Sequence, residues 1–147
     1  HQHWLDNFYP LDLPEEWRLA FYNNVFNCVF LHYSGWSSVD LKKLAAWSED
    51  TGEHFKFVLQ APRLQSQDQE RFECLHKRIG LVIDDKGEIL RGEGECVWLQ
   101  GEVDLKSLAN RLQTNASYTH PLYLLNLDAD LTQLEKVKTL LSLLGLA

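Results

Sequence analysis

The chain has 147 residues, of which 45% are hydrophobic and 24% are charged, and its net charge is −7. This length suits one domain with a sizeable core, and the composition is that of an ordinary globular protein rather than a disordered chain. The acidic balance argues against a general phosphate-binding surface, because nucleic-acid-binding proteins usually carry a basic stripe. We therefore expect a single domain over residues 1–147 that does not bind nucleic acid.

Membrane and secretion signals are not found in the sequence, which has neither a run of about 18 apolar residues nor a signal peptide. The cysteines Cys28, Cys74 and Cys96 are widely spaced and form no C-x-x-C pair. Reduced, buried thiols in a cytoplasmic protein are the simplest interpretation. Because the sequence begins at His1 and contains no Met, we expect a further piece of chain before it.

The first regular elements follow an irregular aromatic stretch. Pro14 tolerates the first turn of a helix, and Trp17, Phe21 and Val25 recur every four residues, which predicts one buried helical stripe. The continuous apolar run 26–33 then predicts a strand that is covered on both faces.

A second helix is predicted over residues 39–48, with Ser37 or Ser38 as its N-cap, and a strand over 55–60 follows. Strand, helix and strand within about 35 residues make a βαβ unit with a right-handed crossover. This unit is expected to be the nucleus of a parallel α/β layer.

The second half predicts further βα repeats around one interruption. A third helix should follow the polar run 65–70, and residues 79–90 predict an inserted β-hairpin in which Gly87 takes the positive-φ position. The stretch 92–95 is interpreted as a linker, because Val97 stands where a phosphate-binding loop would need a third glycine.

After the linker the βα alternation resumes. Residues 96–100 are predicted to form a third parallel strand, followed by a helix that Asp104 caps. Residues 121–125 predict a last strand, and Asp128 or Asp130 should cap the final helix, which Gly145 ends. The fold class is therefore α/β, built mainly of parallel βα repeats with one inserted hairpin.

Aromatic residues and prolines recur at characteristic spacings in the first part of the chain. They are Phe8-Tyr9-Pro10, Leu13-Pro14, Trp17, Tyr22, Phe26-Asn27, Trp36, Trp47, Phe55, Phe57 and Ala61-Pro62-Arg63. This pattern resembles the YecE-like family, a domain of unknown function with a TIM-barrel-like fold, over residues 4–63 and more weakly over 97–128. The resemblance implies a shortened or partial TIM-barrel-like sheet that lacks its middle and also the N-terminal strand expected before residue 1.

Ligands of parallel α/β folds bind at the carboxyl ends of the strands, and there the chain departs from the family. The resemblance implies a glutamate where this chain has Phe30 and a lysine where it has Gln60. It also implies polar or charged residues at the positions of His32, Trp98, Gln100 and Leu127, while Asn126 is kept. Most of these exchanges remove a charge or a titrating group. These exchanges indicate that the functional site of the family has lost its charged and titrating residues in this chain.

Few candidates for chemistry survive. His32 is the candidate catalytic base, and the residues expected to bind a ligand are Tyr33, Gln60, Arg63, Gln100 and Asn126. Neither a metal site nor a cofactor is expected. Helix capping accounts for Asp104, Asp128 and Asp130 more simply than metal binding does.

The sequence leads to two hypotheses about function. The first is a non-catalytic binding or assembly module with an unidentified small-molecule ligand, which forms a homodimer that covers the sheet edges left by missing strands. The alternative is a small divergent hydrolase or isomerase that uses His32, Arg63 and the late carboxylates, including Glu102, in a cleft at the carboxyl ends of the strands.

Overall fold

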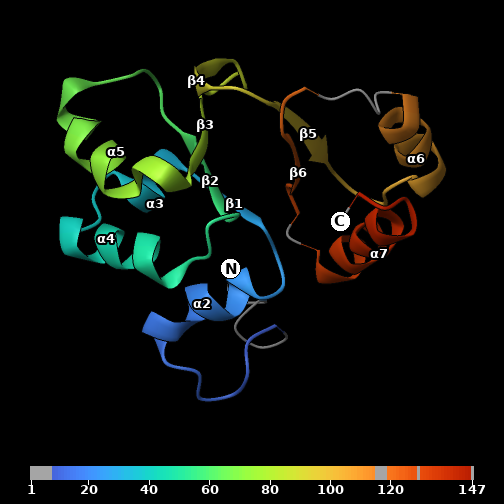
Figure 1. Ribbon diagram of the computed structural model, residues 1–147, viewed down its shortest axis with the longest axis horizontal. Helices are drawn as coiled ribbons and strands as arrows, with labels where there is room; N and C mark the ends of the chain where they lie inside the picture. Colours follow the sequence, from blue (N-terminus) through green and yellow to red (C-terminus); the bar gives the residue numbers. More distant parts are fainter. Residues whose placement is uncertain (1–7, 115–118, 129, 147) are drawn as a thin grey trace. The chain divides into compact units, whose positions relative to one another are not determined.

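The structure is a computed structural model that describes residues 8–114, 119–128 and 130–146 (Figure 1). The described chain falls into two compact α/β units. The N-terminal unit comprises residues 9–94, and the C-terminal unit comprises Phe8 and the described residues from Glu95 onward. Every helix of these described segments is too short or too polar to span a lipid bilayer.

The N-terminal unit contains a mixed sheet of four described strands in the order β1-β2-β3-β4. Strands β1, β2 and β3 are parallel, and β4 is antiparallel to β3. The elements in chain order are η1 (Glu15–Trp17), α2 (Arg18–Asn23), β1 (Cys28–Leu31), α3 (Tyr33–Trp36), α4 (Leu41–Asp50), β2 (Lys56–Gln60), η2 (Ser66–Asp68), α5 (Gln69–Leu75), η3 (His76–Arg78), β3 (Ile79–Ile83) and β4 (Ile89–Gly92). The predicted strand-helix-strand order with parallel pairing of β1 and β2 is confirmed.

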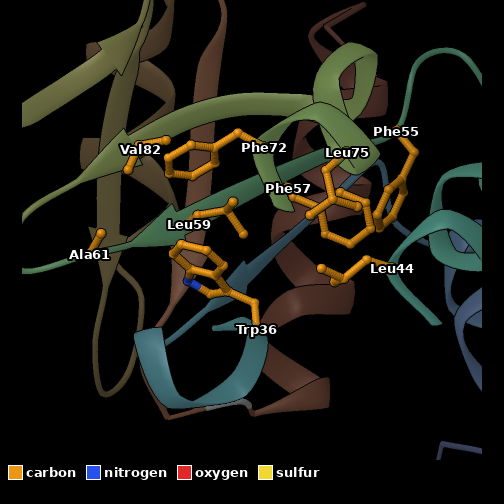
Figure 2. Close-up of a cluster of buried hydrophobic side chains, with 9 residues drawn as sticks. All are labelled: Trp36, Leu44, Phe55, Phe57, Leu59, Ala61, Phe72, Leu75 and Val82. Atoms are coloured by element: carbon orange, nitrogen blue, oxygen red, sulfur yellow. The ribbon is translucent and has the colours of Figure 1, made fainter. Parts of the chain in front are cut away.

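Strand β2 lies between two neighbouring strands, and its side chains alternate between the two faces of the sheet. Phe57 and Leu59 enter a cluster of nine buried side chains between the sheet and the helices (Figure 2). The other members are Trp36, Leu44, Phe55, Ala61, Phe72, Leu75 and Val82. Val58 is fully buried as well, although it points to the opposite face. Each large apolar side chain buried in this way contributes about 1.5–3 kcal/mol.

The first predicted helix is wrong in detail. Residues 15–17 form a 3-10 turn, and the α-helix begins only at Arg18. The change from three to 3.6 residues per turn breaks the expected stripe, and Trp17 is 63% exposed. Strand β1 is half-buried instead of covered on both faces, since it is an outer strand of the described sheet.

The N-cap predicted for the second helix is also wrong. Residues 33–36 form the short helix α3, and Ser37 is its C-cap. Helix α4 therefore starts later, at Leu41, where the Asp40 side chain accepts a 2.7 Å hydrogen bond from the Lys42 amide. Leu44 on this helix is buried, as its inward face requires.

The hairpin β3–β4 is confirmed, and Gly87 in its turn has φ 84°. It does not interrupt the parallel layer, however, because β3 also pairs in parallel with β2. The prediction that residues 96–100 supply the third parallel strand of this layer is therefore wrong. Residues 79–83 take that place, and the later strand belongs to a second sheet.

The C-terminal unit contains a two-stranded parallel sheet in its described part, in which Glu95 lies opposite Leu122 and Leu99 opposite Asn126. Its elements are β5 (Glu95–Leu99), α6 (Leu105–Thr114), β6 (Leu122–Asn126) and α7 (Leu131–Leu143). One cluster of buried side chains in this unit consists of Val97, Leu99, Leu108, Leu112 and Val137. As predicted, α7 ends before Gly145, which has φ 69°.

Gly92 at the end of β4 generates a stability prediction. Its φ is 92°, and a Cβ atom placed there would lie 2.3 Å from the backbone oxygen of Gly80. We expect Gly92→Ala to lower the free energy of unfolding by about 1–3 kcal/mol or more. The positive φ is unfavourable for alanine, and the new Cβ atom would clash with the backbone oxygen of Gly80. Urea denaturation followed by tryptophan fluorescence measures this change.

Gly35 in α3 is the matched control, because a Cβ atom there meets nothing within 4 Å. Gly35→Ala should be neutral or should stabilise by about 0.4–1 kcal/mol. Equal denaturation midpoints for the two alanine variants would contradict the prediction.

Candidate functional site

The carboxyl ends of β1, β2 and β3 meet at one edge of the four-stranded sheet, because these strands are parallel. Polar side chains from four segments gather there. We call this set the carboxyl-end cluster, and its members are His32, Tyr33, Gln60, Asp68 and Asp85.

Gln60, the last residue of β2, links three of these segments. Its Oε1 accepts a 3.2 Å hydrogen bond from the Tyr33 amide and lies 3.3 Å from Nδ1 of His32. Its Nε2 donates to Oδ1 of Asp85 in the β3–β4 turn. Its backbone oxygen accepts a 2.9 Å bond from Nε1 of Trp36. Gln60 thus ties the ends of β1, β2 and β3 together.

Tyr33 is the second centre of the cluster. Its hydroxyl donates to the Asp68 carboxylate, at 3.3 Å from Oδ2 and 3.4 Å from Oδ1. The same hydroxyl oxygen accepts bonds from Nε2 of Gln65 at 3.2 Å and from Nε2 of Gln67 at 3.3 Å. The Trp36 ring meets the Tyr33 ring edge-on, with centroids 5.2 Å apart. Hydrogen bonds of the Tyr33 hydroxyl therefore connect the loop after β2 to helix α3.

Asp68 is a buried carboxylate with an unusual role for its position. It stands at the N-cap of α5, where an aspartate normally accepts hydrogen bonds from the first turn, but its side chain makes no such cap. Only 2% of its surface is exposed, and its oxygens face the Tyr33 hydroxyl. A buried carboxylate is stable only where hydrogen bonds or charges compensate for its lost hydration, so the Tyr33 contact is important for the fold.

The structure brings together three of the residues predicted for the site, namely His32, Tyr33 and Gln60. Arg63 lies exposed in the loop after β2. Gln100 and Asn126 are at the end of the other sheet, in the C-terminal unit, where Oδ1 of Asn126 accepts a 3.2 Å bond from the Asp130 amide. Nδ2 of Asn126 is buried and has no hydrogen-bond partner among the described residues.

The roles of Asp68 and Asp85 are not predicted by the sequence. In the sequence Asp68 is simply a polar residue at the start of a helix, and Asp85 is a typical turn residue. No local signal distinguishes these roles from a contact with Tyr33 or Gln60. Both contacts join residues more than 20 positions apart in the chain, namely 35 and 25.

The late carboxylates are largely accounted for by local structure. Asp104 accepts bonds from the amides of Lys106 and Ser107 at the start of α6. Asp130 likewise accepts bonds from the first turn of α7, so capping is confirmed for both aspartates. Oδ2 of Asp128 instead accepts a 2.6 Å bond from the Gly101 amide, which joins the loops after β5 and β6.

The three cysteines, all within described segments, are free thiols that are half-buried rather than fully buried as predicted. Burial, followed by the charge of Glu95, raises the pKa of Cys96 to about 11. Cys96 is therefore a neutral thiol near pH 7, which is unsuited to nucleophilic attack or metal binding. In the described part of the chain, no group of three or more His, Cys, Asp or Glu side chains could hold a metal ion.

The capping of α6 leads to a prediction about pH. The hydrogen bond from the Ser107 hydroxyl, at 2.7 Å, is the main reason why the pKa of Asp104 is lowered. A carboxylate with a lowered folded-state pKa stabilises the fold above its unfolded pKa, and this stabilisation is lost as the pH falls through the folded-state pKa. We expect Ser107→Ala to raise the Asp104 pKa toward its usual value, as measured by NMR titration of the carboxyl carbon. The control Ser142→Ala, on α7, should leave that titration unchanged, and an unaltered Asp104 pKa in Ser107→Ala would contradict the assignment.

The Tyr33–Asp68 contact gives a second prediction for this site. Tyr33→Phe removes the hydroxyl donor and leaves a buried carboxylate, so the free energy of unfolding should fall by about 1–3 kcal/mol. In a double-mutant cycle with Asp68→Ala, the losses should be less than additive, with a coupling of about 0.5–3 kcal/mol. Gln67→Ala, at an exposed partner of the same hydroxyl, should change stability by no more than about 0.5 kcal/mol. Strict additivity of the Tyr33 and Asp68 losses in urea denaturation would refute the coupling.

The sequence matches the model of a protein family. The model of the family described as "Protein of unknown function DUF72" matches residues 1–143. No curated protein and no solved structure gives a significant match. Since the matched region covers nearly the whole sequence, the chain belongs to the DUF72 family, whose function is unknown.

Proposed function

We propose that the chain is a non-catalytic binding or assembly module, a divergent and shortened YecE-like member of its family with a partial TIM-barrel-like architecture and one domain over residues 1–147. The observation that carries this proposal is the use of Gln60. At the end of β2, where the resemblance implies a lysine, a neutral amide accepts from Tyr33 and donates to Asp85.

The chemistry of the two side chains explains why this exchange matters. A lysine ammonium has three donors and no acceptor, whereas a glutamine amide offers both. A lysine at this position could not accept the hydrogen bond from the Tyr33 amide. Gln60 therefore suits a cross-link between strand ends and does not supply a charge or a titrating proton for a reaction. The replacement of lysine by glutamine therefore favours a binding module over an enzyme.

The proposed ligand is a small molecule that takes no metal or cofactor with it. His32, Tyr33, Gln60 and Arg63 are proposed as contacts at the end of the four-stranded sheet, and His32 and Arg63 are exposed there. Within the C-terminal unit, Gln100 and Asn126 are proposed as a separate set of contacts at the end of that unit's sheet, the second because its buried Nδ2 lacks a partner among the described residues. The three free thiols support a reducing compartment such as the cytoplasm.

Assembly is proposed to occur through the edges of the four-stranded sheet, which would make the chain a homodimer. Strands β1 and β4 are the outermost described strands of this sheet. Outer strands present unpaired backbone groups that can pair with another chain. On β4 the side chain of Ile89 is 46% exposed, which adds an apolar contact at that edge.

The homodimer leads to a measurable expectation. Wild-type protein should approach twice the mass of one chain as its concentration rises in sedimentation equilibrium. Ile89→Lys places a charge on the edge strand and should keep the protein monomeric over the same range. Leu64→Lys is the matched control, because Leu64 is 50% exposed but lies in a loop, and this variant should still associate. A wild-type mass that stays monomeric throughout would exclude the dimer.

A small divergent hydrolase or isomerase is the second candidate, and one observation favours it. Tyr33 and the buried Asp68 carboxylate form a hydrogen-bonded pair of titratable groups near His32, of the kind that acid–base catalysis uses. Since Asp104 and Asp130 cap helices, the candidate is now carried by His32, Tyr33 and Asp68.

The two candidates differ in what His32→Ala should do. The binding module predicts no hydrolase or isomerase turnover by wild-type protein above that of the His32→Ala variant, across a panel of ester, phosphoester, glycoside and sugar substrates. The enzyme predicts a wild-type activity that falls by about 100-fold or more in His32→Ala, the usual contribution of a general acid or base, while Ser142→Ala, on α7, retains it. Such a loss would replace the first proposal with the second.

A further inference from the structure

The orientation of the Gln60 amide group is determined by two neighbours with opposite hydrogen-bonding ability. The Tyr33 backbone N–H can only donate, and it points at Oε1 of Gln60. A carboxylate can only accept, and that of Asp85 faces Nε2 of Gln60. If the amide oxygen and nitrogen were exchanged, the amide N–H₂ would face the Tyr33 N–H, donor against donor. The amide oxygen would then face the Asp85 carboxylate, acceptor against acceptor. Oε1 is therefore the atom that faces His32.

This orientation dictates which nitrogen of the neutral His32 ring carries the proton. Nδ1 of His32 lies 3.3 Å from Oε1 of Gln60, which is an acceptor only. A neutral imidazole has one donor and one acceptor nitrogen, and a lone pair on Nδ1 would face the lone pairs of Oε1. The proton must therefore be on Nδ1, and Nε2 must carry the lone pair.

A second contact holds the ring in place. The Phe30 and His32 rings meet edge-on, with centroids 4.9 Å apart and an interplanar angle of 77°. Phe30 occupies a position where the resemblance implies a glutamate, so one of the exchanged residues now supports the imidazole. His32 itself is exposed, which leaves its outer nitrogen within reach of a bound molecule.

We propose that Gln60 is a positioning residue, which holds neutral His32 in the Nδ1–H tautomer and thereby presents Nε2 as a hydrogen-bond acceptor to the ligand. The ligand class that this nitrogen selects is a molecule with an O–H or N–H donor, such as a hydroxyl, amide or ammonium group. The ligand class rests on the proposed binding function at this end of the sheet. The tautomer depends only on the contacts of His32 with Gln60.

Long-range ¹H–¹⁵N NMR correlation of the uniformly ¹⁵N-labelled full chain tests the tautomer directly. For the neutral ring, the pattern of couplings from the ring protons identifies the protonated nitrogen. Wild-type His32, assigned with the His32→Ala variant, should show Nδ1 as the protonated nitrogen. A wild-type ring protonated mainly at Nε2 would overturn the proposal whatever the variants show.

Three variants separate positioning from a general structural role. Gln60→Leu removes the acceptor, so the ratio of Nδ1–H to Nε2–H should fall by about fivefold or more, the effect of losing one ordinary hydrogen bond. Gln60→Glu combined with Asp85→Asn, whose amide can donate to the new carboxylate, retains an oxygen acceptor toward His32 and should keep the Nδ1–H form. Gln65→Leu, which alters a glutamine bonded to Tyr33 but not to His32, should leave the ratio unchanged. An unchanged ratio in folded Gln60→Leu would also overturn the proposal.

No ligand is needed for this measurement, so its failure is distinguishable from failure of the proposed function. A ring found in the Nε2–H form would refute the positioning role and leave the binding module untouched. Conversely, turnover that depends on His32 would refute the binding module, and the Nδ1–H tautomer would then identify Nε2 as the nitrogen that accepts a proton.

Discussion

The burial of strand β2 is the constraint on which the N-terminal unit depends. Phe57 and Leu59 pack into the cluster shared with the helices, and Val58 between them is fully buried on the opposite face. A strand buried on both faces must be apolar along its length, and its polar groups can appear only where it ends. This is why Gln60 and the residues that contact it gather at a single edge of the sheet.

At that edge, the residues that differ from the family pattern make structural contacts that the sequence alone did not predict. Sequence comparison treats Gln60 and Phe30 as lost polar functions. In three dimensions Gln60 joins Tyr33 to Asp85, and Phe30 packs against the ring of His32. The exchanged residues have thus become parts of one hydrogen-bonded and packed arrangement, in which a buried carboxylate, Asp68, is also held by the Tyr33 hydroxyl.

Local chemistry made several features predictable. The hairpin over residues 79–90 follows from the positive φ that Gly87 can adopt, and the start of α6 follows from the short side chain of Asp104. The candidate residues His32, Tyr33 and Gln60 were also identified in advance, because apolar runs mark where strands end and parallel strands place those ends together. In each case the deciding interaction lies within a few residues or follows from a general rule of parallel sheets.

Patterns in the sequence thus predict the order of strands and helices, most of the turns and caps, and the edge of the sheet where polar residues collect. Long-range contacts are needed to explain why β3 is the third parallel strand and why β5 belongs to another sheet. They also explain why Trp17 is exposed and why Asp68 is buried against Tyr33. The physical reason is distance along the chain. Helix caps and turns are stabilised by neighbours in sequence, whereas strand partners and burial are chosen by competition among residues that are far apart in the chain.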